Sequence, residues 1–154
     1  MRFLEKFFYA NLILLGLVWL RVGLEKLFSG NFIQNLPNTL EKFASKNPYP
    51  LYKDFLDNIA IPNFVIFGNL TLYGEILTGL GLMTLPLFYI FKNDQQKIFR
   101  ILLIGALIGG LLMNATYWLS SAWMSSSNDN LNLLMFGLES ISLIYLIRSK
   151  EGEK

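Results

Sequence analysis

Four stretches of this chain are long and apolar enough to cross a lipid bilayer, and this feature limits the fold more than any other. The hydrocarbon core of a bilayer is about 30 Å thick, so a spanning helix needs roughly 20 mainly apolar residues. Because backbone amides in lipid must bond within their own segment, each stretch is predicted to be a helix. The fold class predicted is all-α: a single domain, residues 1–154, forming a four-transmembrane-helix bundle with spans at residues 7–28, 64–91, 98–119 and 131–147.

The residue types that the chain lacks exclude much chemistry. Only 16% of its residues are charged, against about 25% in an ordinary soluble domain. It has no cysteine and no histidine, which rules out disulfides, thiolate nucleophiles and the usual ligands of haem and metals. We therefore expect no metal site and no cofactor held by His or Cys. The net charge of +2 is too small to indicate a nucleic-acid partner.

The first connection, residues 29–63, carries helical patterns of its own. Apolar residues recur at helical spacing in two groups, and Lys alternates with Glu or Asp on the other face. The pattern predicts two short amphipathic helices in this first extracytoplasmic loop. They could cover the mouth of the bundle or serve only as an interfacial anchor. The two groups are Leu36, Leu40, Phe43 and Ala44, and then Leu51, Tyr52, Phe55, Leu56 and Ile59.

The distribution of Lys and Arg predicts the orientation in the membrane. The positive residues outside the spans collect on one side, and cytoplasmic loops carry such an excess. The first stretch also resembles the start of a signal peptide, but no small-residue cleavage pattern follows, so we expect it to remain as a span. The prediction is a multi-pass protein of the cell membrane with cytoplasmic N and C termini. The positive residues on that side are Arg2, Lys6, Lys92, Lys97, Arg100, Arg148, Lys150 and Lys154, against Lys42, Lys46 and Lys53 opposite.

Several polar side chains lie inside the apolar spans, where an ionised group costs about 2.5–3.5 kcal/mol. Counting about 1.5 Å per residue places them in the outer half of the bundle, at one shared level. Arg21 is expected to be the buried cation, because Lys26 lies near enough to a helix end to reach outward. The cluster is interpreted either as an ion-pair network that fixes helix packing or as a ligand or proton site. The polar residues are Arg21, Glu25, Lys26, Asn69, Glu75, Asn114 and Glu139.

The aromatic residues allow two interpretations as well. Tyr117, Trp118 and Trp123 lie near the outer boundary, where aromatic belts commonly anchor spans. Alternatively, a flat aromatic wall of Trp19, Tyr73 and Trp118 could hold a quinone-like ring. The candidate catalytic residues are Arg21, Glu75 and Glu139, and the candidate ligand-binding residues are Glu25, Lys26, Asn69, Tyr73, Asn114 and Trp118.

Three motifs, in order along the chain, give a resemblance to a known family. They are Gly16 with residues 23–28, then residues 47–56, then residues 74–75 with 79–82. Together, over roughly residues 10–147, the chain resembles the DoxX/DoxD family, which includes the DoxD-like small subunit of thiosulfate:quinone oxidoreductase. The resemblance implies a four-helix membrane subunit that passes electrons from a sulfur compound to quinone. It also implies that Gly23 and Lys26 form the family's Gly-x-x-Lys feature.

Three functions follow as hypotheses. In the first, the chain is a subunit of a quinone-linked oxidoreductase, with Arg21 as the electrostatic partner of the ring and Glu75 or Glu139 as proton carrier. It would work with a second membrane or extracytoplasmic subunit, or as a homo-oligomer, within the lipid bilayer. In the second, it is a non-catalytic structural or assembly subunit of a larger membrane complex. Transport of a small anion or proton is the third.

Overall fold

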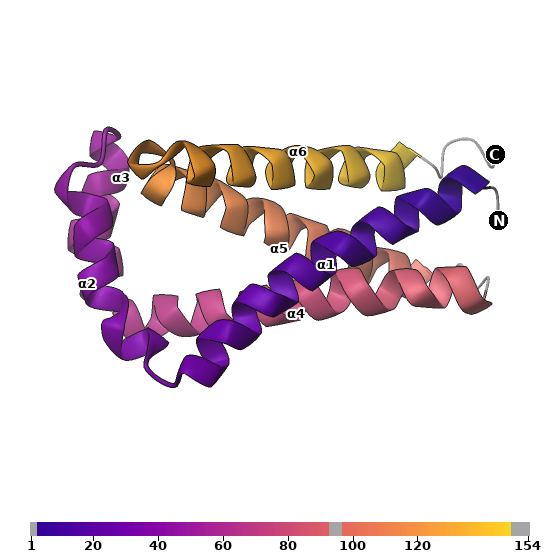
Figure 1. Cartoon of the computed structure of the whole chain (residues 1–154), viewed down its shortest axis with the longest axis horizontal. Helices are drawn as coiled ribbons and strands as arrows, with labels where there is room; N and C mark the ends of the chain where they lie inside the picture. Colours follow the sequence, from indigo (N-terminus) through magenta and orange to yellow (C-terminus); the bar gives the residue numbers. More distant parts are fainter. Residues whose placement is uncertain (1–2, 93–96, 149–154) are drawn as a thin grey trace.

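The computed structural model describes residues 3–92 and 97–148, and within them the fold is all-α without strands. Four long helices form the bundle, as predicted: α1 (Phe3–Ser29), α4 (Phe64–Lys92), α5 (Lys97–Ser121) and α6 (Ser126–Arg148). Figure 1 shows α1 crossing α4, while α5 and α6 run together as a second pair. Arg2, Lys150 and Lys154, which entered the orientation argument, lie outside the described residues.

The four long helices have the length and composition of membrane spans. The candidate spans are Glu5–Ser29, Phe64–Phe91, Lys97–Met124 and Ser126–Arg148, with mean hydropathies between 1.5 and 2.0. Large apolar side chains project outward from all four helices, including Leu14, Leu77, Leu112 and Ile141, each more than 60% exposed. Such a surface suits lipid rather than water. The chain is therefore built as a multi-pass integral membrane protein.

Helices α1 and α4 approach closely because glycines face each other across their crossing. A Cβ at Gly79 would lie 2.5 Å from the backbone nitrogen of Leu20, and a Cβ at Gly16 would lie 2.6 Å from that of Met83. Small residues at such crossings let helices pack in lipid, where no hydrophobic force drives them together. This contact fixes the face of α1 that turns toward α4.

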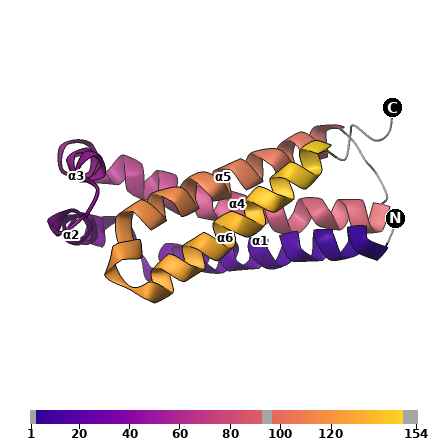
Figure 2. The same cartoon turned by 90° about the horizontal axis from the view of Figure 1, so that it is seen from above.

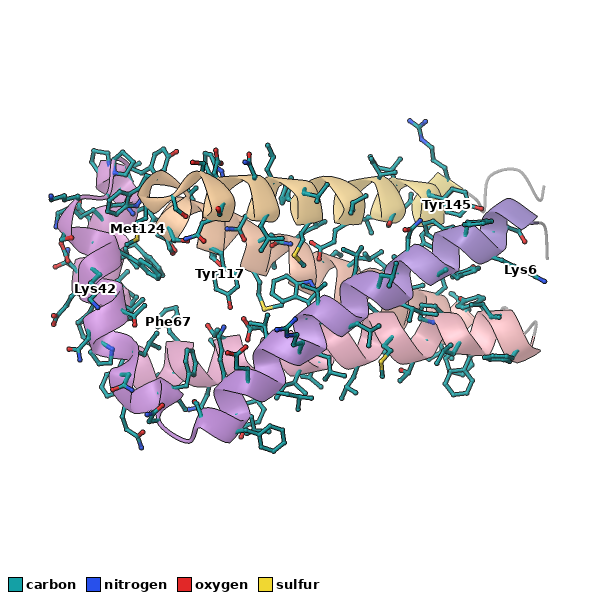
Figure 3. The ribbon with its side chains drawn as sticks, viewed as in Figure 1. Lys6, Lys42, Phe67, Tyr117, Met124 and Tyr145 are labelled. Atoms are coloured by element: carbon teal, nitrogen blue, oxygen red, sulfur yellow. The ribbon has the colours of Figure 1, made fainter. Side chains whose placement is uncertain are left out.

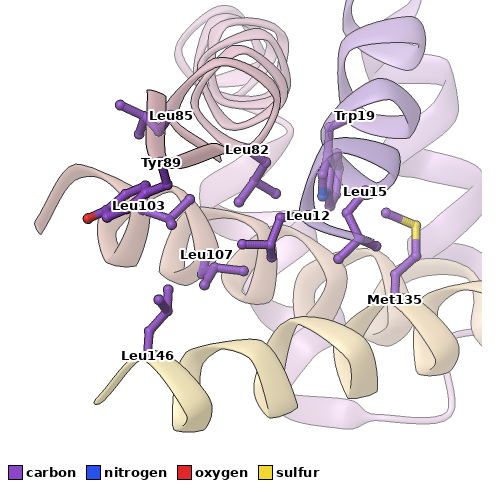
Figure 4. Close-up of a cluster of buried hydrophobic side chains, with 10 residues drawn as sticks. All are labelled: Leu12, Leu15, Trp19, Leu82, Leu85, Tyr89, Leu103, Leu107, Met135 and Leu146. Atoms are coloured by element: carbon purple, nitrogen blue, oxygen red, sulfur yellow. The ribbon is translucent and has the colours of Figure 1, made fainter. Parts of the chain in front are cut away.

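A buried apolar cluster joins the four long helices toward the end of the bundle where α1 begins and α6 ends. Figure 4 shows its side chains meeting between the helices. Its interior members Leu12, Leu82, Leu103 and Leu107 are fully buried. The whole cluster consists of Leu12, Leu15, Trp19, Leu82, Leu85, Tyr89, Leu103, Leu107, Met135 and Leu146.

The segment between α1 and α4 lies across the opposite end of the bundle (Figures 1 and 2). It comprises α2 (Phe32–Ser45), α3 (Pro50–Phe55) and a π-helical turn, η1 (Leu56–Ala60). We call residues 32–60 the lid. Its inward faces form a cluster of their own, Leu36, Leu40, Ala44, Leu56 and Ala60. The two predicted amphipathic helices are thus confirmed, although the second ends in the π-helical turn.

The lid is attached to the C-terminal end of α5 by hydrogen bonds. The Asn47 amide donates to the carbonyl oxygen of Leu119 at 3.0 Å. The Tyr52 hydroxyl lies 3.1 Å from the carbonyl oxygen of Thr116 and 2.8 Å from Ser120 Oγ. A short 3-10 turn, η2 (Ala122–Met124), then leads from α5 into α6. These tethers hold the lid over the bundle rather than beside it.

Candidate functional site

Two carboxyl groups are buried in the interior of the bundle. Glu75 of α4 and Glu139 of α6 both have no exposed surface. A charge placed in such surroundings is costly unless other groups pair with it. The partners of each carboxyl group therefore define what the cluster can do.

Glu75 is paired with a lysine and a tyrosine from two other helices. Lys26 of α1 forms an ion pair with Glu75 Oε1, and the Tyr117 hydroxyl of α5 donates to the same oxygen. Lys26 Nζ also donates to the Tyr117 hydroxyl oxygen at 3.2 Å. The other carboxyl oxygen, Glu75 Oε2, is buried without a hydrogen-bond partner among the described residues.

The expectation that Arg21 is the buried cation is wrong. Arg21 and Glu25 are both exposed, and Lys26 takes the inward position. The reason is the face of α1 that packs on α4, where a Cβ at Gly23 would lie 3.2 Å from Glu75 Cβ. Lys26 lies three residues after Gly23 and so shares its face, whereas Arg21 and Glu25 point away.

Glu139 is held by two neutral donors. Trp19 Nε1 of α1 donates to Glu139 Oε1 at 2.7 Å, and Asn114 Nδ2 of α5 donates to Glu139 Oε2 at 2.8 Å. Gly110 makes room for this carboxyl group, because a Cβ there would lie 2.5 Å from Glu139 Oε1. The group is thus fixed in position by hydrogen bonds and by the absence of a side chain at Gly110.

The two carboxyl clusters lie at one level of the bundle. The rings of Trp19 and Tyr117, which belong to different clusters, are 6.1 Å apart between centroids. Asn114 and Tyr117 are three residues apart on α5, about one helical turn. The structure therefore brings Lys26, Glu75, Asn114 and Glu139 into one polar layer.

A cavity of about 280 Å³ lies between the lid and this polar layer; we call it the lid cavity. Lys26 and Tyr117 form part of its wall, and most of the remaining wall is apolar. Figure 3 shows Tyr117 and Phe67 pointing into the space between α5 and α4, next to α2. Six aromatic rings line the cavity: Phe32, Phe43, Tyr52, Phe55, Phe67 and Tyr117.

The ammonium group of Lys26 is held between aromatic rings at the cavity wall. Its Nζ lies 5.1 Å from the ring centroid of Phe32, a lid residue, and 5.2 Å from that of Tyr117. A cation over an aromatic face is stabilised by the ring quadrupole. This arrangement keeps the charge of Lys26 next to the cavity rather than drawn out to the membrane surface.

Five of the six predicted ligand-binding residues lie outside the lining of the lid cavity, and Lys26 is the one that belongs to it. Glu25 is exposed. Tyr73 is 55% exposed on the surface of α4. The Asn69 amide donates to the carbonyl oxygen of Val65 in its own helix. Trp118 donates to Asp129 and lines a separate groove of about 390 Å³ between α5 and α6, with Phe136. Asn114 donates to Glu139 and lines the same groove. The expected aromatic wall of Trp19, Tyr73 and Trp118 is therefore not assembled.

The lid supplies most of the aromatic wall instead, a role that the sequence alone does not predict. Phe32, Phe43 and Phe55 belong to the amphipathic segments of residues 32–60. Tyr117, first placed in an interfacial belt, lies one turn beyond Asn114 on the same face of α5. The signal in the sequence is the helical spacing of these aromatic residues. This spacing does not show that the lid covers the bundle, so it does not by itself predict the aromatic wall.

No group of three or more His, Cys, Asp or Glu side chains that could hold a metal comes together within residues 3–92 and 97–148. Comparisons with protein-family models, with curated proteins and with solved structures find no match for this chain. The resemblance to the DoxX/DoxD family therefore stays a prediction.

Proposed function

We propose that this protein is a DoxX/DoxD-like membrane subunit of a quinone-linked oxidoreductase and that it binds the quinone ring in the lid cavity. The observation that supports this most is the combination of an aromatic cavity with a buried Lys26–Tyr117–Glu75 group on its wall. A quinone site needs an apolar slot with a few polar groups placed to meet the ring oxygens.

The size and lining of the lid cavity fit one substituted ring. Its volume of about 280 Å³ is near the lower end of the range for ligand pockets, roughly 300–1,000 Å³. An ammonium group has three N–H donors. Lys26 directs one to Glu75 and one to Tyr117, so the third is available to a ring oxygen. There it would stabilise negative charge that develops on that oxygen during reduction.

The Glu75 carboxyl group gives this site a way to exchange protons. It lies behind Lys26 and Tyr117 as seen from the cavity, and its Oε2 has no partner among the described residues. Reduction of a quinone to a quinol takes up two electrons and two protons. The Tyr117 hydroxyl, hydrogen-bonded to Glu75, provides a path for one proton between the cavity and the bundle interior.

The electrons would come from a partner. With no Cys or His in the chain, the usual haem and iron–sulfur ligands must belong to a second subunit or to the electron donor itself. We propose a membrane or extracytoplasmic partner that oxidises a sulfur compound such as thiosulfate. The excess of Lys and Arg on one side supports a topology with cytoplasmic termini and with the lid on the extracytoplasmic side.

The alternative, a non-catalytic assembly subunit, is favoured by a different surface. An open groove of about 630 Å³ runs between α4 and α5, and its lining combines Leu and Ile side chains with small residues that include Gly74, Gly81 and Gly105. Small residues allow the close approach of another helix in lipid, either from a partner or from a second copy of this chain. Purification from native membranes would separate the cases: a stoichiometric partner with no bound quinone supports assembly alone.

Quinone binding to the purified protein in lipid nanodiscs is the direct test. We expect a short-tailed benzoquinone to quench the tryptophan fluorescence, and Lys26→Met to weaken binding at least tenfold, about 1.4 kcal/mol. Lys46→Met is the matched control, because Lys46 is an exposed lysine of the lid that does not line the cavity. Equal affinities in the wild type and Lys26→Met would remove the basis of the proposal.

A further inference from the structure

Besides the three threonines Thr39, Thr71 and Thr116, the wall of the lid cavity has two separate polar points and is otherwise apolar. The inner point is Lys26 Nζ with the Tyr117 hydroxyl, and the outer point is the Tyr52 hydroxyl with Ser120. On α5, Tyr117 and Ser120 are three residues apart, which corresponds to about 4.5 Å along the helix. A ligand that fills the cavity therefore meets polar groups at two places on its ring.

The inner point offers a hydrogen-bond donor. The Tyr117 proton is used in the bond to Glu75, and two N–H groups of Lys26 are used by Glu75 and Tyr117. The third N–H group of Lys26 remains. A ring oxygen at this point therefore accepts a hydrogen bond from Lys26, whether it is a carbonyl or a hydroxyl oxygen.

The outer point offers an acceptor. Either hydroxyl can donate in the Tyr52–Ser120 contact at 2.8 Å. We assign the Ser120 proton to the carbonyl oxygen of Thr116, its shorter contact at 2.7 Å, and the Tyr52 proton then goes to Ser120 Oγ or to the same carbonyl. Within the described residues, nothing then donates to the Tyr52 oxygen. Burial raises the pKa of Tyr52 above its usual value of 10.0, so this hydroxyl keeps its proton at neutral pH.

A quinol and a quinone differ at this outer point. A quinol hydroxyl can donate to the Tyr52 oxygen, but a quinone has only carbonyl acceptors to present. Turning the Tyr52 proton toward a quinone carbonyl would take it from Ser120 or Thr116, and Ser120 could restore its bond to Tyr52 only by giving up its own bond to the Thr116 carbonyl oxygen. An acceptor that meets another acceptor leaves both groups unpaired, which is costly in a desolvated pocket.

We propose that the Tyr52 oxygen makes the lid cavity selective for the quinol over the quinone, so that Tyr52 is a specificity-determining residue. This inference rests on the proposed function. One hydrogen bond gained by the quinol corresponds to about tenfold tighter binding. For a two-electron couple, a tenfold difference raises the potential of the bound ligand by about 30 mV. The bound quinone would thereby accept electrons more readily.

The test compares the dissociation constants of a short-tailed benzoquinone and of its reduced quinol, measured without oxygen by tryptophan fluorescence in nanodiscs. We expect the quinol to bind about tenfold more tightly. Tyr52→Phe should bring the ratio close to one by weakening quinol binding alone. Lys26→Met should weaken both ligands and leave the ratio in place, because the inner point does not distinguish them.

Two control variants separate recognition from loosening of the lid. Asn47→Ala removes another lid tether but does not line the cavity. Ser120→Ala removes one partner of Tyr52 and leaves its oxygen as an acceptor. Both should keep the tenfold ratio even if the two affinities fall together. If Tyr52→Phe fails to fold, the dimethyl ether of the quinol serves on the wild-type protein and should bind no better than the quinone.

The outcomes distinguish the two proposals. If neither ligand binds, the proposed function and this inference both fail. If both bind equally well, or if Tyr52→Phe or the dimethyl ether retains the tenfold advantage, the selectivity of Tyr52 is overturned while the quinone site stands.

Discussion

At the scale of single residues, the site depends on a lysine, a tyrosine and a glutamate from three helices. Glu75 is fully buried, and the side chain of Lys26 is 22% exposed. Removing one member of a buried pair leaves the other charge without compensation, which costs more than the pair itself contributes. The Lys26–Glu75 pair therefore has a structural effect that can be measured separately from ligand binding.

Lys26→Met should lower the stability of the protein markedly. We expect a loss of about 3 kcal/mol, because Glu75 would remain buried beside Tyr117 without its cation. Arg21→Met should change stability by less than about 0.5 kcal/mol, because Arg21 is exposed. Thermal unfolding in detergent measures both. A larger loss for Arg21→Met than for Lys26→Met would contradict the pairing described here.

Gly110→Ala should also be destabilising, by about 1–3 kcal/mol, since the added methyl group would overlap the Glu139 carboxyl group. Gly105→Ala on the same helix is the matched control, because a Cβ there meets nothing within 4 Å. It should leave stability unchanged or raise it slightly, as alanine favours a helix more than glycine does. Equal melting temperatures for the two variants would show that Glu139 is not held as described.

Much of the polar layer could be predicted at this scale, but its cation could not. The burial of Glu75, Glu139 and Asn114 follows from the cost of polar groups in an apolar span. The expectation of Arg21 fails because it assumes that Lys26 reaches outward from its helix end, whereas Lys26 turns inward to Glu75. Which face of α1 turns inward is set by the glycine contacts with α4, and these depend on both helices together.

At the scale of elements, the lid determines what the bundle can bind. The recurrence of apolar residues within residues 32–60 was enough to predict its helices. The sequence could not predict the lid cavity, because its volume depends on how far the lid lies above α4 and α5. That distance is set by tethers between residues far apart in the chain, such as Asn47 and Leu119.

Asn47→Ala should increase the mobility of the lid. The loss of one hydrogen bond, about 1 kcal/mol, should speed amide hydrogen exchange across residues 32–60 about fivefold where exchange proceeds through lid opening. Asn38→Ala provides the comparison, because Asn38 is exposed on α2. Unchanged exchange in Asn47→Ala would indicate that this tether does not hold the lid in place.

At the scale of the whole molecule, two helix pairs meet at one end and are bridged by the lid at the other. The apolar cluster of Figure 4 joins the pairs, and the lid cavity lies between them at the lid end. The bundle was predictable from four apolar stretches alone. The splaying of the pairs at the lid end was not, since it arises from packing between helices.

The orientation of the chain in the membrane is a property of the whole molecule. Because the chain has no native cysteine, a single introduced cysteine gives a unique labelling signal in intact cells. Ser45→Cys on the lid and Ser126→Cys at the start of α6 should react with an impermeant thiol reagent from outside. Ser149→Cys should react only after the membrane is permeabilised. Labelling of Ser149→Cys in intact cells would reverse the assignment.

A quinone site in the lid cavity is tested most directly by photo-crosslinking with an azido-benzoquinone followed by peptide mapping. We expect adducts on the lid and α4 peptides that contain Phe55 or Phe67, and their loss in Lys26→Met. Adducts confined to the groove between α5 and α6, at Trp118 or Phe136, would contradict this expectation.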